Sequence, residues 1–249
     1  MKFEFAGTTC YYKEIGSGKP LLLVHGWGGS SQSLLSLAKR LKDSYKVYML
    51  DLPGFGKSEA PKSAWGVDEY SAFVSEFLEQ VIKTPVIYFG HSFGGGIGVY
   101  LAANLPSMFD RLILCGAAII RNPTEARASK IIKKVIPFYS SFKKYFRPAR
   151  KLYYKIFYPR SDLLKNEHLE GSFRKIINQD LSSYLPKITT PTLILWGSED
   201  SYTPVKQSHI IHEAMSGSKL EILTGASHSL PLEQSEWVYK NLVDFIDRK

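Results

Sequence analysis

A serine between two glycines is the residue pattern in this sequence that could most directly do chemistry. The segment Gly90-His91-Ser92-Phe93-Gly94 places a glycine two positions before and two positions after Ser92. In a sharp turn from a strand into a helix, this spacing exposes the serine hydroxyl, and the glycines remove side chains that would collide. Such a hydroxyl can act as a nucleophile. A glycine-rich loop can show the same spacing by chance, so the elements on either side of the turn decide between the two interpretations.

Short apolar segments alternate with stretches of helical spacing along most of the chain. Strands are predicted at 2–10, 11–15, 20–24, 45–50, 85–89, 111–115, 192–196 and 220–223. Helices are predicted at 30–42, 67–82, 94–105 and 205–215, and a last one begins at about 231. This alternation indicates an α/β fold with a mostly parallel sheet of eight strands and helices on both faces. The turn at Ser92 therefore joins a strand to a helix, at the sheet edge where such folds bind ligands.

With these elements in place, the sequence resembles the α/β-hydrolase superfamily, in its serine esterase and lipase-like branch, over essentially the whole chain. Five motifs carry the resemblance in the family's order: His25-Gly26-Trp27-Gly28-Gly29, Asp51-Leu52-Pro53-Gly54-Phe55-Gly56-Lys57-Ser58, Gly90-His91-Ser92-Phe93-Gly94-Gly95, Trp196-Gly197-Ser198-Glu199-Asp200 and Gly225-Ala226-Ser227-His228. The resemblance implies the α/β-hydrolase fold, with a core formed by residues 1–120 and 188–249. A basic helical cap or lid at 121–187 is inserted after the sixth strand.

The nucleophile needs a base beside it, and the base needs an acid to orient it. The family's chain order is serine, acid, histidine, and His228 is the histidine in a loop after the last predicted strand. Without the other motifs, His228 would be an ordinary histidine of a surface loop. Asp200 and Glu199 both follow the strand at 192–196. The resemblance places the acid on Asp200, with Glu199 as the competitor, and so implies a catalytic triad of Ser92, Asp200 and His228.

An oxyanion hole is expected beside this serine, formed by two backbone N–H groups. One belongs to Phe93, the residue after the nucleophile. The resemblance places the second on Trp27, in the loop after the strand at 20–24, and the Trp27 ring is expected to line the acyl pocket. The residues that support these two turns are His25, Gly26, Gly90, His91 and Gly94.

The positive charge of the chain is concentrated in one segment. Lys and Arg number 32 and Asp and Glu 23, a net charge of +9, yet residues 121–175 alone hold 15 basic and 4 acidic residues, a net charge of +11. Aromatic residues lie among these charges, a pattern that also occurs in nucleic-acid binding. In this fold we prefer a lid with an aromatic inner face and a basic outer face. That outer face would suit an acidic carrier protein or an anionic substrate, or would serve solubility alone.

Several other classes of protein are excluded by the sequence. The glycine-rich loop at 26–29 lacks the Lys-Ser/Thr pair of a phosphate-binding loop, and no metal-ligand spacing is present. We therefore expect neither a cofactor nor a metal. Cys10 and Cys115 are interpreted as small buried apolar residues rather than a disulfide pair. No apolar run approaches the ~18–20 residues of a membrane span, and the N-terminal residues lack a signal-peptide core, so a cytoplasmic location is expected.

The identity of the nucleophile limits the classes of reaction that the chain could catalyse. Family members that open epoxides or cleave carbon–halogen bonds carry Asp where this chain has Ser92, so the resemblance implies acyl transfer. A carboxylesterase for short-to-medium acyl chains is expected, and a lactonase, including the acyl-homoserine-lactone type, is the alternative. The His25–Gly28 start is also similar to the acyl-carrier-protein methyl ester esterases, which suggests esterase or thioesterase action on a carrier. Those proteins usually have Trp where His91 stands here. A slow-hydrolysing ligand receptor is the non-enzymatic alternative.

Overall fold

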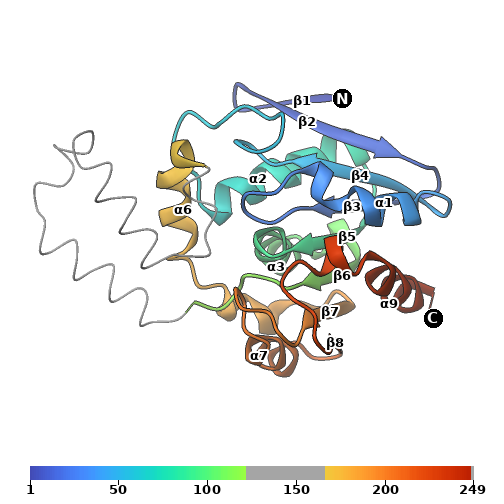
Figure 1. Cartoon of the computed structure of the whole chain (residues 1–249). Coiled ribbons are helices and arrows are strands. Elements are labelled where there is room, and N and C mark those ends of the chain that lie inside the picture. The colour runs from blue at the N-terminus through green and yellow to red at the C-terminus, as the bar shows by residue number, and fades with distance from the viewer. Residues whose placement is uncertain (122–165, 248–249) are drawn as a thin grey trace, which may run out of the picture.

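A computed structural model describes residues 1–121 and 166–247, and a sheet of eight strands forms its centre (Figure 1). The strands are β1 (Lys2–Phe5), β2 (Thr8–Ile15), β3 (Lys19–Val24), β4 (Tyr45–Asp51), β5 (Val86–His91), β6 (Phe109–Cys115), β7 (Thr192–Gly197) and β8 (Lys219–Leu223). Their order in space is β1-β2-β4-β3-β5-β6-β7-β8. Only β1 and β2 are antiparallel to their neighbours, and β3 to β8 are parallel. The predicted fold class is confirmed.

The first two strands differ from the sequence prediction. Strands were expected at 2–10 and 11–15, but the chain turns at Ala6 and Gly7, and Cys10 lies within β2 opposite Phe3. Both turn residues have positive φ, 49° for Ala6 and 69° for Gly7. Such backbone angles are typical of the two-residue turns that match the twist of a hairpin. Alanine rarely adopts them, so the sequence pattern around Ala6 did not indicate a turn.

Helices cover both faces of the sheet. The described helices are α1 (Leu35–Leu41), α2 (Val67–Phe77), α3 (Phe93–Asn104), α6 (Glu170–Ile176), α7 (Lys206–Ala214), α8 (Leu230–Glu233) and α9 (Ser235–Asp247), with 3₁₀ turns at Ser31–Leu34, Pro106–Met108, Glu167–Leu169 and Ser182–Lys187 and a π-helical turn at Leu78–Ile82. Buried side chains of α2, α3 and α7 pack on one face, and those of α1 and α9 on the other. Within the described ranges, no helix is both long and apolar enough to cross a bilayer.

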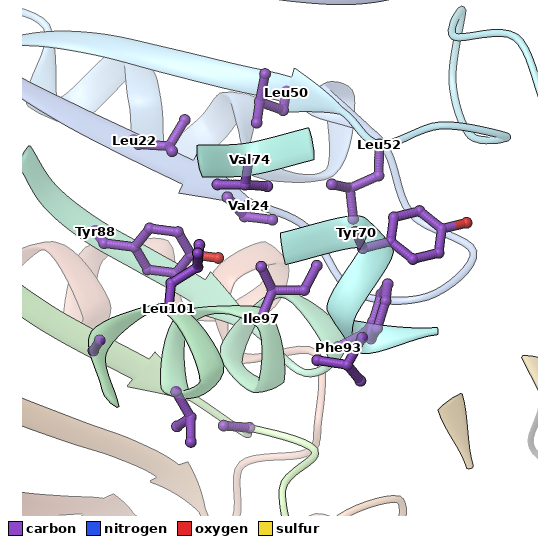
Figure 2. Packing of buried hydrophobic residues seen from close by; sticks show 14 of the residues in the cluster. Leu22, Val24, Leu50, Leu52, Tyr70, Val74, Tyr88, Phe93, Ile97 and Leu101 are labelled. Atoms are coloured by element: carbon purple, nitrogen blue, oxygen red, sulfur yellow. The ribbon is translucent and has the colours of Figure 1, made fainter. Parts of the chain in front are cut away.

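The face covered by α2 and α3 lies directly beneath the turn at Ser92. Figure 2 shows side chains of both helices meeting side chains of the strands in one continuous layer, among them Leu22, Val24, Tyr70, Val74, Tyr88, Phe93, Ile97 and Leu101. Tyr70 packs edge-on against Phe93, with ring centroids 5.1 Å apart, and its hydroxyl donates to the carbonyl oxygen of Pro53 at 3.0 Å. This packing fixes the start of α3 relative to α2.

The segment between β6 and β7 is where the cap was predicted, at 121–187. Residues 122–165 of this predicted helical cap lie outside the described residues. The described part, from residue 166 on, is hydrogen-bonded to the core. The Trp65 N–H donates to Ser172 Oγ at 2.9 Å, and the Leu181 N–H donates to the carbonyl oxygen of Ile119 at 3.0 Å. These bonds hold α6 and the turn after it against the core.

We predict that Phe77→Ala lowers the free energy of unfolding by about 3–5 kcal/mol, as measured by urea denaturation. The Phe77 side chain is fully buried and its ring packs against Phe3, Tyr12 and Tyr48 on three different strands, with centroids 5.5, 5.0 and 6.2 Å away. Leu105→Ala is the control, because Leu105 is exposed, and should change stability by less than about 0.5 kcal/mol. Equal losses in the two variants would contradict this prediction.

Candidate active site

Ser92 occupies a strained turn between the end of β5 and the start of α3. Its φ and ψ are 50° and −113°, a region that residues with a side chain adopt only when their surroundings enforce it. A Cβ atom on Gly90 would collide with the carbonyl group of Gly94, and one on Gly94 would collide with that of Val24. Glycine at these two positions is therefore what lets the turn close. A strained turn between a strand and a helix agrees with the local geometry predicted for Gly90–Gly94, whereas the catalytic role of Ser92 stays a prediction.

Hydrogen bonds tie this turn to the loop that follows β6. The Ser92 N–H donates to the carbonyl oxygen of Cys115 at 2.9 Å, and the Ser92 carbonyl oxygen accepts from the Ala118 N–H at 3.0 Å. The same oxygen accepts from Gly95 at 2.9 Å within the first turn of α3. These bonds fix the backbone of Ser92, and the residue itself is only partly buried.

The structure brings Asp200 and His228 into direct contact. His228 Nδ1 lies 2.6 Å from Asp200 Oδ2, and the Asp200 side chain is 1% exposed. The other carboxylate oxygen accepts from the N–H groups of Tyr202 at 2.9 Å and Thr203 at 2.8 Å. Glu199 is exposed. Of the two acids considered from the sequence, Asp200 is therefore the one that lies against the histidine.

The protonation of this pair follows from its surroundings. Burial raises the pKa of Asp200, but the hydrogen bonds from His228 and Thr203 and the attraction to His228 outweigh burial, and the pKa lies below its usual range. Asp200 is therefore ionised at neutral pH and accepts a hydrogen bond from His228 Nδ1–H. With Nδ1 used as a donor, Nε2 of the neutral imidazole is the nitrogen that can accept a proton.

Ser92 and His228 lie against the same short segment of chain. A Cβ atom on Gly116 would come within 3.2 Å of both His228 Nδ1 and Asp200 Oδ2, and Gly116 directly follows Cys115, which accepts from the Ser92 N–H. Among the described residues, Ser92 Oγ and His228 form no hydrogen bond. Such bonds are often long in ligand-free enzymes and tighten when substrate binds, so the missing bond does not argue against His228 as the base.

His91 holds the loop that carries His228. Its Nε2 donates to the carbonyl oxygen of His228 at 2.9 Å, and the two rings lie 4.9 Å apart. Burial, together with repulsion from His228, lowers the pKa of His91 to about 3. His91 is therefore neutral at ordinary pH and serves as a hydrogen-bond donor. The sequence predicted it only as part of a supporting turn, and its partner lies 137 positions away in the chain.

The loop after β3 packs against the serine, as expected for an oxyanion hole. A Cβ atom on Gly26 would come within 2.9 Å of Ser92 Cβ. His25 is buried and shapes the loop, since its Nε2 accepts from the Leu52 N–H at 3.1 Å and its Nδ1 donates to the Gly26 carbonyl at 2.7 Å. Burial lowers the pKa of His25, which keeps the ring neutral in this role. Trp27 follows directly and lies beside Phe93.

Aromatic side chains surround this part of the site. The Trp27 ring lies 5.9 Å from the ring of Phe93, 4.9 Å from that of Phe55 and 5.3 Å from that of Phe173 on α6. Phe93 is the first residue of α3, where a backbone N–H has no partner within the helix. The N–H groups expected to bind an oxyanion therefore lie beside an apolar wall, which α6 completes from the side of the predicted cap.

Thr203 is a contact of the acid that sequence reasoning missed. Its hydroxyl lies 2.9 Å from Asp200 Oδ2, 3.1 Å from the carbonyl oxygen of Gly116 and 3.3 Å from His228 Nδ1. A threonine three positions after an aspartate in a loop is a local pattern that often marks a hydrogen-bonded turn. That signal could have identified Thr203 as a partner of Asp200, although not its proximity to His228.

Hydrogen bonds give the turn at 51–58 a structural role in the described part of the chain. The Asp51 carboxylate accepts from the N–H groups of Ser31 at 2.6 Å and Lys57 at 3.0 Å, and Ser58 Oγ donates to the Asp51 carbonyl oxygen at 2.6 Å. Its oxygens are therefore occupied by the backbone. Elsewhere in the described parts of the chain, no three His, Cys, Asp or Glu side chains gather in a way that could hold a metal ion.

Comparison with known proteins gives matches along nearly the whole chain. A family model described as alpha/beta hydrolase fold matches residues 19–147, more than half of the chain. The uncharacterized hydrolase YugF of Bacillus subtilis is 24% identical over 268 residues, which cover 98% of this chain and 97% of YugF. A pimeloyl-[acyl-carrier protein] methyl ester esterase of Neisseria meningitidis serogroup C is 26% identical, with 92% and 94% covered. The solved esterase of Exiguobacterium antarcticum aligns with a TM-score of 0.76 and 26% identity over 96% of both chains.

We predict that His91→Gln makes the free energy of unfolding less dependent on pH in the acidic range. Between its ordinary value of 6.5 and its pKa of about 3 in the folded chain, His91 binds a proton only when the protein unfolds. The free energy of unfolding therefore falls as the pH falls through this range. In urea denaturation, the decrease in the free energy of unfolding from pH 7 to pH 4.5 should be smaller in the variant than in the native protein, by roughly 2 kcal/mol.

Glutamine is the matched replacement because its amide N–H can still donate to the His228 carbonyl oxygen. The pH dependence, rather than the absolute stability, is therefore the quantity to compare. His25, also buried, is present in both proteins and contributes equally. Identical losses on acidification would show that His91 is already protonated in the folded protein at pH 4.5.

Proposed function

The chain belongs to the alpha/beta hydrolase fold family, and we propose that it is a serine hydrolase that cleaves carboxylic esters through an acyl-enzyme. The observation that carries the proposal is that the strained Ser92 and the buried Asp200–His228 pair lie against the same segment, Cys115–Gly116. A serine hydroxyl becomes an effective nucleophile when a base takes its proton, and the base is oriented by an acid. We assign Ser92, His228 and Asp200 to these three roles, at the carboxyl ends of the parallel strands.

In the proposed reaction, Ser92 Oγ attacks the ester carbonyl carbon while His228 Nε2 takes the hydroxyl proton. Asp200 accepts from Nδ1–H throughout and stabilises the imidazolium that forms. The backbone N–H groups of Phe93 and Trp27 donate to the oxyanion of the tetrahedral intermediate. His228 then gives its proton to the leaving alcohol, and the acyl group stays on Ser92. Water attacks the acyl-enzyme by the same steps, releasing the acid and restoring the hydroxyl.

The chemistry of Ser92 favours acyl transfer over the other reactions of the family. An oxygen nucleophile on serine forms an ester with the acyl group, which water cleaves readily with the same base. The esterases among the similar proteins support this choice. The rings of Phe55 and Phe173 pack on that of Trp27, and we take these rings as the wall of a pocket for acyl groups of short-to-medium length. Lactones would follow the same path, with the leaving alcohol still attached to the acyl group.

We further propose that the residues from 121 to 187 form the cap of this enzyme, beside the core at 1–120 and 188–249. The described end of that segment supports the proposal, because Phe173 packs on the Trp27 ring and Lys175 Nζ lies 3.0 Å from Glu69 Oε1 on α2. A cap in this place would cover the acyl group. Its excess of basic residues would face an anionic substrate or an acidic carrier protein.

We predict that Ser92→Ala abolishes hydrolysis of p-nitrophenyl esters while leaving the thermal unfolding curve intact. Removing the hydroxyl removes the nucleophile, so kcat should fall by at least about 10⁴-fold, as expected for a member of a catalytic triad. A fluorophosphonate should label the native protein at residue 92 and fail to label the variant. A panel of esters and lactones of graded length, assayed with both proteins, measures the preference for acyl chain. Retention of several per cent of kcat in Ser92→Ala would reject the proposal.

We predict that the two neighbouring acids behave differently on conversion to their amides. Asp200→Asn removes the charge that orients His228, and kcat should fall by up to ~10⁴-fold, by analogy with other triads. Glu199→Gln is the matched control, since its side chain is exposed, and kcat should stay within about two-fold of the native value. Comparable losses in both variants would point to Glu199 as a second participant and contradict the assignment to Asp200 alone.

A further inference from the structure

The ring of Tyr202 lies almost flat on the imidazole of His228. The two ring centroids are 5.0 Å apart and the planes are inclined by 28°. Tyr202 belongs to the loop between β7 and α7, two positions after Asp200, and its backbone N–H donates to Asp200 Oδ1 at 2.9 Å. One residue thus contacts the acid through its main chain and the base through its side chain. The residue types around Tyr202 do not predict this double contact.

The exposure of this ring is unusual for its size. Tyr202 is 55% exposed, whereas most large apolar side chains of the described chain are buried. No hydrogen bond of the Tyr202 hydroxyl is recorded with any described residue. The contact with His228 is therefore made by the face of the ring and not by its polar end. This aromatic ring therefore lies at the surface and does not pack into the core.

Other contacts of His228 hold its ring at Nδ1, where Asp200 Oδ2 and Thr203 Oγ1 lie. The ring of His91 is also near, with centroids 4.9 Å apart, but its plane is inclined by 42° to the imidazole. Contacts at one edge leave the imidazole able to tilt about the Nδ1 hydrogen bond, which would displace Nε2. A ring stacked on the imidazole face opposes that tilt. Aromatic faces also attract cations, so the same stacking favours the imidazolium that exists while His228 carries the proton of Ser92.

We propose that Tyr202 is a positioning residue, whose ring keeps the imidazole of His228 turned toward Ser92. Its effect on turnover rests on the proposed function, whereas its effect on the His228 ring does not. The proposal assigns the role to the aromatic face, so Phe should replace Tyr202 and Leu should not. The competing explanation is that the exposed ring contacts the substrate. In that case, replacing Tyr202 would raise KM and leave kcat unchanged.

The test compares Tyr202→Leu and Tyr202→Phe with the native protein, using p-nitrophenyl butyrate as substrate. For Tyr202→Leu we expect kcat to fall about five-fold with little change in KM, since a stacked pair is worth roughly a factor of two to ten. Tyr202→Phe should restore most of the loss. The rate of fluorophosphonate labelling at Ser92 should follow kcat. Ile210→Ala on α7 is the control, because Ile210 is also an exposed large side chain, and it should leave both constants unchanged.

A second measurement does not depend on activity. In protein labelled at histidine carbons, the ring proton signals of His228, assigned with His228→Gln, should be shifted upfield by the Tyr202 ring. That shift should persist in Tyr202→Phe and be lost in Tyr202→Leu. If Tyr202→Leu keeps the His228 shifts, or keeps kcat while KM rises, the positioning role is wrong. If the native protein neither hydrolyses esters nor reacts with the fluorophosphonate, the proposed function fails, and the ring signals alone decide whether Tyr202 orients His228.

Discussion

The left-handed backbone of Ser92 is the constraint on which the geometry of the site depends. A residue with a side chain at φ 50° costs on the order of 1–3 kcal/mol and persists only where neighbours enforce it. Here the neighbours are the loops after β3 and β6, which contact Ser92 through Gly26, Cys115 and Ala118. The strand order β3-β5-β6 is what places these loops on either side of the serine. The central sheet therefore places the loops that enforce the strained backbone of Ser92.

The second half of the site is held by hydrogen bonds rather than by backbone strain. Asp200 is buried with both oxygens occupied, by His228 on one side and by the N–H groups of Tyr202 and Thr203 on the other. A buried carboxylate is stable only with such compensation. Because the same bonds keep the carboxylate ionised, they also fix the tautomer of His228. The charge of Asp200 and the orientation of His228 are thus set by the same hydrogen bonds.

Local signals in the sequence were enough to predict the parallel strands and the loops that carry Ser92, Asp200 and His228. Each of these residues follows a short apolar segment, so its place at the sheet edge could be inferred without coordinates. The hairpin was mispredicted because the turn is made by Ala6 in a backbone region that alanine seldom adopts. The contact between His91 and His228 could not be predicted, since it depends on how separate loops pack. The stretch at 122–165 lies outside the described residues, and its helices stay a prediction.

The separation of β6 and β7 in the chain has a consequence for biosynthesis. The two strands are adjacent in the sheet, yet the segment that ends at residue 187 lies between them. The entropy cost of closing such a loop grows only with the logarithm of its length, so a long insertion between the two strands is tolerated. Ser92 precedes this insertion in the chain, whereas Asp200 and His228 follow it. A nascent chain that has made only the first half displays an open edge at β6 and lacks both Asp200 and His228. Under the proposed function, it would stay inert on the ribosome until its last strands have been added.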